Sequence, residues 1–133
     1  MKRLLVAAVI VLVSCKPPTP AEQMDAILSW VGSAVMLGSG WLRHTTPDSY
    51  TTQTLSLSRD HLLQIGAELL KSPPATIDSA GLDSTLTRSR SHIARMAQLV
   101  EARNSPAFSQ VLDSLQLDQK ALKQIADKVE ASQ

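Results

Sequence analysis

Apolar and polar residues follow a helical period along four stretches of the chain. The stretches cover residues 21–43, 58–71, 78–103 and 106–131, and in each of them apolar residues recur in steps of three and four. This spacing places the apolar side chains on one face of an α-helix. Four amphipathic helices of this kind predict an all-α fold, an antiparallel four-helix bundle. The expected seams are Met24, Leu28, Val31, Val35, Gly38 and Leu42; Leu62, Ile65 and Leu69; Leu82, Leu86, Ser89, Ile93, Met96 and Val100; Phe108, Val111, Leu115, Leu122, Ile125 and Val129.

The connection between the first two helices is expected to be long. Residues 44–58 are dense in Thr and Ser, and Pro47-Asp48 is a turn signal, so this segment is expected to be a loop. Ser58 is then the expected N-cap of the second helix.

The later helix starts carry clearer signals. The third helix begins near Asp78, with Asp83 as an alternative cap because Gly81 weakens the first turn. The fourth helix begins where Ser105 caps a turn that has Pro106 at its first helical position.

Asp118 interrupts the seam of the fourth helix, because it falls where the heptad spacing expects an apolar residue. Two interpretations are open. The helix ends at Leu117 and restarts with Asp118 as its cap, or the helix continues and Asp118 faces water at the rim of the bundle. We expect a continuous helix with a local irregularity.

The first helix carries a second apolar stripe beside its seam. Trp30 and Trp41 lie on this stripe, within about 20° of each other at ~100° per residue, and residues 26–42 contain no charge. The stripe predicts a widely buried central helix, a surface for a partner or for lipid that is formed by the two tryptophans, or a membrane-spanning helix. Gly and Ser residues and a length at the bottom of the spanning range argue against the third interpretation.

The amino-terminal segment has the pattern of an export signal. Lys2 and Arg3 precede an unbroken apolar run at residues 4–13. The run has the length of a signal peptide and is shorter than the roughly 20 residues that a permanent spanning helix requires.

The apolar run ends in Leu12-Val13-Ser14-Cys15, a tetrapeptide that resembles the lipobox of bacterial lipoproteins. The resemblance covers residues 1–15 and implies lipid transfer to the Cys15 sulfur, cleavage after Ser14 and acylation of the new amino terminus. The alternative is an uncleaved helix in which Cys15 is an ordinary thiol. The next residue is not Asp, which by the same resemblance favours the periplasmic face of the outer membrane over the inner membrane.

The lipobox divides the chain into a signal peptide at 1–14, a lipidated cysteine with a Pro-rich tether at 15–20, and a helical domain at 21–133. Three prolines within residues 17–20 favour extended polyproline geometry. At ~3.1 Å per residue the tether spans on the order of 15 Å. We therefore expect the domain to stand close to its membrane.

Composition narrows the range of functions. The chain has 13 basic and 12 acidic residues, which gives no electrostatic case for binding nucleic acid. Aromatic residues make up 3% of the chain, so the core must be aliphatic, and the single cysteine leaves no disulfide.

Candidate chemistry is sparse. His44, His61 and His92 are the only histidines, and they flank the seams without occupying them, so we expect surface or interfacial side chains and no metal or other cofactor. In an antiparallel pair of helices His61 and His92 can approach within one turn. Asp60 beside His61, in a chain rich in serine, gives only a chance resemblance to a hydrolytic triad.

Four arginines of the third helix project away from its seam, which is typical of a solvated surface or of a docking site for an acidic group. These are Arg88, Arg90, Arg95 and Arg103.

The pattern as a whole favours a non-enzymatic envelope lipoprotein that presents helical surface to another envelope protein, as an accessory subunit, adaptor or assembly factor. Trp30 and Trp41 are the expected partner surface, provided that they are exposed. The alternative is a carrier that holds a small apolar ligand in a pocket lined by Met24, Met36, Met96 and the tryptophans.

Overall fold

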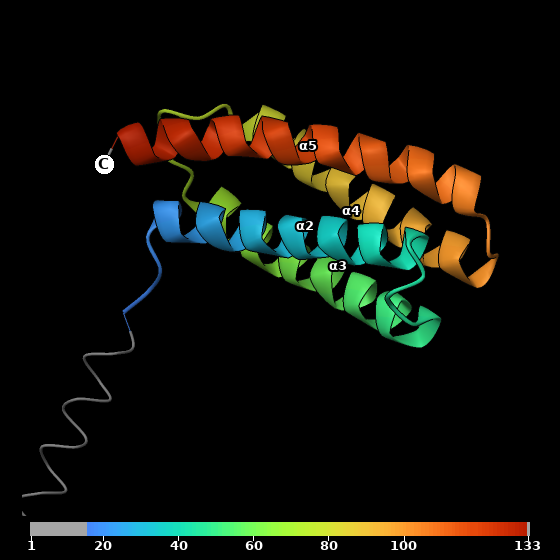
Figure 1. Cartoon of the computed structure of the whole chain (residues 1–133). Helices are drawn as coiled ribbons and strands as arrows, with labels where there is room; N and C mark the ends of the chain where they lie inside the picture. Colours follow the sequence, from blue (N-terminus) through green and yellow to red (C-terminus); the bar gives the residue numbers. More distant parts are fainter. Residues whose placement is uncertain (1–15, 133) are drawn as a thin grey trace, which may run out of the picture.

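The computed structural model describes residues 16–132, which form four α-helices and no strand. Helix α2 spans Pro20–Leu42, α3 spans Asp48–Lys71, α4 spans Ser79–Glu101 and α5 spans Ser105–Ala131 (Figure 1). The prediction of an all-α fold with four helices is confirmed. The expected signal peptide and Cys15 lie outside the described residues.

The helices pack side by side along a common long axis, and their connections lie at alternating ends of the molecule (Figure 1). Each helix packs on the next one in the chain, and α5 also packs on α2, which closes the group. The amino-terminal end of α2 lies near the carboxyl end of α3, where Glu22 and Glu68 line one hollow. The carboxyl end of α2 meets the amino-terminal end of α5, where the rings of Trp41 and Phe108 lie 4.6 Å apart. This packing is that of a helical bundle.

The core is mainly aliphatic, as the composition predicted, with Trp41 and Phe108 as its aromatic members. All four helices contribute to one continuous cluster of buried side chains. Its largest fully buried members are Phe108, Met24, Ile27, Leu55, Leu62, Leu69, Leu82, Leu86, Ile93, Met96, Leu115 and Leu122.

Helix α3 begins about ten residues earlier than the sequence predicted, so the expected loop at 44–58 and the expected cap at Ser58 are wrong. Pro47 has extended backbone and precedes the first turn. Thr51 and Ser58 are buried and donate their hydroxyl protons to the carbonyls four residues earlier, at 2.7 and 2.9 Å. Their short side chains therefore satisfy their polar atoms within the helix and lie on its core face with Leu55.

The expected caps of the later helices are confirmed in one case and wrong in the other. Asp78 Oδ1 accepts a hydrogen bond from the Ala80 N–H at 3.1 Å, so Asp78 caps α4 as predicted. Helix α5 is capped by Asn104, whose Oδ1 accepts from the Ala107 N–H at 3.2 Å. Ser105 is the first residue of the helix; Asn competes well for N-cap positions.

A short connection joins α2 to α3. Trp41 Nε1–H donates to Asp48 Oδ1 at 2.7 Å, which links the end of one helix to the start of the next. Gly40 lies against Thr46 so closely that a Cβ atom would collide with its hydroxyl. Among the described residues, no helix has an apolar stretch long enough to cross a bilayer.

Gly38 offers a test of core packing. A Cβ atom at this buried position would lie 2.8 Å from Met96 Cε, 3.2 Å from Leu112 Cδ1 and 3.3 Å from Phe108 Cε1. We predict that Gly38→Val lowers the free energy of unfolding by about 2 kcal/mol through overpacking, as measured by urea denaturation.

Gly32 in the same helix provides the matched control. Its Cβ position has only an ordinary contact, at 3.5 Å from Gln119 Nε2. Gly32→Val should change the free energy of unfolding by less than about 0.5 kcal/mol. Equal losses in the two variants would contradict the tight approach of α2 to α4 and α5.

Candidate functional site

A buried carboxylate lies at the middle of the interface between α4 and α5. The side chain of Asp118 is 3% exposed, although both neighbouring seam residues, Leu115 and Leu122, are leucines in the core. Helix α5 is continuous through this position, as expected. The expectation that Asp118 faces water at a rim is wrong, because two side chains of α4 supply the polar contacts that water would have made.

Each oxygen of the Asp118 carboxylate has its own partner. Arg88 Nε–H donates to Oδ1 at 2.8 Å, and His92 Nδ1 lies 2.7 Å from Oδ2. A carboxylate can only accept, so the proton of this second hydrogen bond belongs to His92 Nδ1. Arg88 and His92 are four residues apart, which places them one turn apart on the same side of α4.

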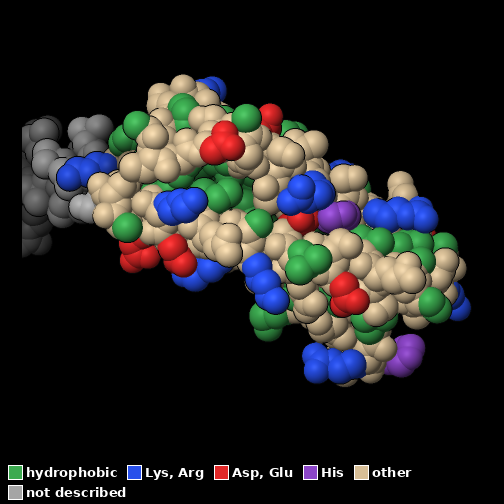
Figure 2. All heavy atoms as spheres, turned by 90° about the horizontal axis from the view of Figure 1, so that it is seen from above, with side chains coloured by type: hydrophobic (Ala, Val, Ile, Leu, Met, Phe, Trp, Pro, Cys, Tyr) green, Lys and Arg blue, Asp and Glu red, His purple; other side chains and the backbone are tan. Residues whose placement is uncertain are grey.

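The two partners reach the carboxylate from the surface. The side chain of Arg88 is 50% exposed and that of His92 is 25% exposed. Figure 2, which views the molecule from the α5 side, shows a histidine with basic side chains around it and an acidic side chain beside it. The charge of Asp118 is therefore balanced from outside the core.

A surface hollow opens above this cluster. It lies between α4 and α5 and is lined by Arg88, His92, Ser114, Leu117 and Asp118. Only one feature of the sequence pointed to this hollow, namely the polar residue in an apolar seam. Spacing alone did not show that two residues of another helix face that position.

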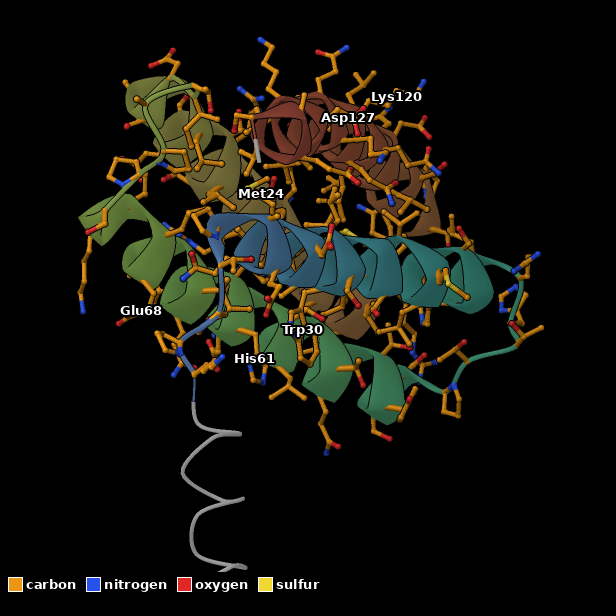
Figure 3. All side chains as sticks on the ribbon, turned by 90° about the vertical axis from the view of Figure 1, so that its left-hand side faces the viewer. Met24, Trp30, His61, Glu68, Lys120 and Asp127 are labelled. Carbon is orange, nitrogen blue, oxygen red and sulfur yellow. The ribbon has the colours of Figure 1, made fainter. Side chains whose placement is uncertain are left out.

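A second constellation lies between α2 and α3. The rings of Trp30 and His61 are stacked, with centroids 4.2 Å apart and planes 6° apart. Figure 3 shows the two side chains at the seam between these helices. Both are partly exposed, so the stack forms part of the molecular surface.

The two tryptophans of the expected partner surface have different surroundings. Trp41 is 7% exposed and packs on Phe108 within the core. Its ring is therefore not part of the surface. Of the pair, Trp30 alone is partly exposed, and the buried part of its side chain packs against the core.

The structure separates the histidines into different environments. His61 packs on Trp30 and His92 bonds to Asp118, while His44 is exposed at the end of α2. Asp60, beside His61, accepts hydrogen bonds from Arg59 at 3.4 Å and from no other side chain of the described part of the chain. Within residues 16–132 there is no group of three or more metal-ligating side chains.

The arginines of α4 also differ in their surroundings. Arg88 alone lines the hollow. Arg90 donates to Thr87 Oγ1 at 3.4 Å and Arg95 donates to Gln98 Oε1 at 3.3 Å, both as exposed contacts within α4. Most of the expected basic face is thus solvated surface.

An exposed groove between α2 and α5 is lined by Leu28, Gln119, Lys120, Lys123 and Gln124. Lys123 Nζ donates to Asp127 Oδ1 at 2.9 Å, and this hydrogen bond and the negative charge of Asp127 raise the pKa of Lys123. The pair is solvent-exposed on the outer side of α5, where ion pairs contribute little to stability.

Comparison with protein-family models, with curated proteins and with solved structures finds no match for this chain.

The energetics of Asp118 can be tested by replacing it with the residue that the seam expects. Replacing a buried ion pair by an apolar residue of similar volume is often neutral or stabilising. We predict that Asp118→Leu leaves the free energy of unfolding unchanged or raises it, because Arg88 can turn towards water.

His92→Ala is the informative counterpart, because it leaves one oxygen of the buried Asp118 carboxylate without its partner. We predict a loss of about 2 kcal/mol in the free energy of unfolding. Urea denaturation of both variants at one pH measures the difference. If Asp118→Leu lowers the free energy of unfolding more than His92→Ala does, the carboxylate makes a net stabilising contribution and this prediction is wrong.

Proposed function

We propose that this chain is a non-enzymatic lipoprotein of the bacterial cell envelope, anchored through lipid on Cys15, whose antiparallel helical bundle presents a surface to an envelope protein. The lipobox-like tetrapeptide at residues 12–15 supports the anchor. The partly exposed stack of Trp30 on His61 is the observation that carries the partner surface.

The stack has the properties of an interface anchor. Trp combines a large apolar area with few rotatable bonds, and it is enriched among the residues that dominate binding energy. The imidazole of His61 holds the indole of Trp30 parallel to it, so the ring is already ordered before a partner binds.

One exposed apolar side chain lies beside the stack. Leu57 is 49% exposed and lies one turn before His61 on α3. A hollow with both polar and apolar lining residues lies further along the same seam, and it is lined by Pro18, Glu22, Gln23, Ala26, Gln64, Ile65 and Glu68. We define the α2–α3 surface as Trp30, Leu57 and His61.

The alternative of an apolar-ligand carrier is not favoured by the placement of the methionines. Met24 and Met96 are fully buried in the packed core, whereas Met36 is 77% exposed on the outside of α2. These side chains do not line one pocket among those described.

Membrane attachment can be tested on the cysteine itself. Cys15→Ser removes the sulfur that would receive lipid, so we expect metabolic labelling with palmitate to mark the wild-type protein and not this variant. Ser14→Ala keeps a small residue before the cysteine and should still be labelled. An unlabelled wild-type protein that keeps the mass of its precursor would reject the anchor.

The α2–α3 surface can be tested by photo-crosslinking in cells. We expect a photoreactive residue in place of Leu57 to give a defined protein adduct, and Trp30→Ala in the same chain to reduce its yield at least about tenfold, because interface anchors are worth about 2 kcal/mol or more.

Met36 is the matched control position. Its side chain is even more exposed than that of Leu57, but it lies on a different side of α2 from Trp30. A photoreactive residue there should not give the same adduct. Identical adducts from both positions, or an adduct at position 57 that does not depend on Trp30, would contradict the proposed surface.

A further inference from the structure

Asp118 fixes two donor groups at the surface of the bundle. It uses only Nε of the Arg88 guanidinium and only Nδ1 of the His92 ring. The described residues provide no hydrogen-bond acceptor for the two Nη atoms of Arg88 or for Nε2 of His92. The buried carboxylate therefore orients these groups and leaves their outer donors available.

The geometry that remains on Arg88 matches a carboxylate. The two Nη groups of a guanidinium form a planar fork that binds the two oxygens of a carboxylate or phosphate in parallel. Because Nε is held by the carboxylate of Asp118, whose side chain is only 3% exposed, the fork is less free to rotate than that of a surface arginine.

The wall of the hollow opposite Arg88 is uncharged apart from Asp118. It is formed on α5 by Ser114 and Leu117, and Leu117 is 65% exposed. An entering anion therefore meets the outer Nη donors of an oriented guanidinium whose Nε is already paired with Asp118, together with a histidine and an exposed apolar side chain. A ligand that combines a carboxylate with an adjacent apolar group suits this lining better than a bare ion does.

We propose that the hollow between α4 and α5 binds an acidic side chain of a partner protein, with the Nη atoms of Arg88 holding the carboxylate and Leu117 packing against an apolar neighbour of that residue. When its ring is protonated, His92 adds a donor through Nε2. The inference rests on the proposed function in that the partner is a protein, but it concerns the opposite pair of helices from the α2–α3 surface.

The test uses the full chain in detergent and a terminally blocked Leu-Glu-Leu peptide as the probe. NMR signals of the Arg88 Nε–Hε group and of the Leu117 methyl groups report on the hollow. We expect both to shift saturably with the Leu-Glu-Leu peptide and not with a Leu-Gln-Leu peptide, because the amide cannot accept the charge-assisted pair of hydrogen bonds.

Three variants separate recognition from folding. Arg88→Lys keeps the positive charge and removes the fork, so it should weaken peptide binding roughly tenfold, whereas Arg90→Lys, on the same helix but outside the hollow, should not. Leu117→Ala alters only an exposed side chain, so the bundle stays folded, and it should also weaken binding.

Equal shifts with the two peptides would overturn the proposal. So would inorganic phosphate that saturates the same signals at lower concentration than the Leu-Glu-Leu peptide, since that result assigns the hollow to a phosphate group. Either result leaves crosslinking through Leu57 unaffected, so failure of this site and failure of the α2–α3 surface are distinguishable.

Discussion

A carboxylate placed in an aliphatic core must be compensated by its neighbours, and this constraint shapes the interface between α4 and α5. Removing a carboxylate from water costs several kcal/mol even after the protein relaxes. The bundle meets this cost with one hydrogen bond to each oxygen of Asp118, from Arg88 and from His92. Neither partner is itself deeply buried, so the ion pair joins the core to the surface.

The remainder of the bundle is held together by apolar contacts, which need no compensating hydrogen bonds. Side chains from all four helices bury one another in a single aliphatic cluster, and burial of apolar area is the main favourable contribution to folding. A leucine at position 118 would extend this apolar packing between Leu115 and Leu122. The carboxylate instead accepts hydrogen bonds from Arg88 and His92, and it thereby orients both side chains at the surface.

The helical class and most helix ends were readable from the sequence, because apolar spacing and capping residues act over a few neighbours. The start of α3 was not, since Thr51 and Ser58 lie on its core face and bond to their own helix, so tertiary burial overrode their loop preference. The Asp118 cluster was missed for a related reason. Its partners are 30 and 26 residues away in the chain, and local patterns do not show which residues of another helix face a given position.

Asp118 lies inside a continuous α5 and holds the imidazole of His92 through its Nδ1 proton. Long-range ¹H–¹⁵N NMR of the histidine rings at alkaline pH measures this directly, because it reports which ring nitrogen carries the proton. We expect Nδ1 of His92 to carry the proton and Asp118→Leu to abolish this preference. A His92 ring that is protonated only at Nε2 in the wild-type protein would contradict it.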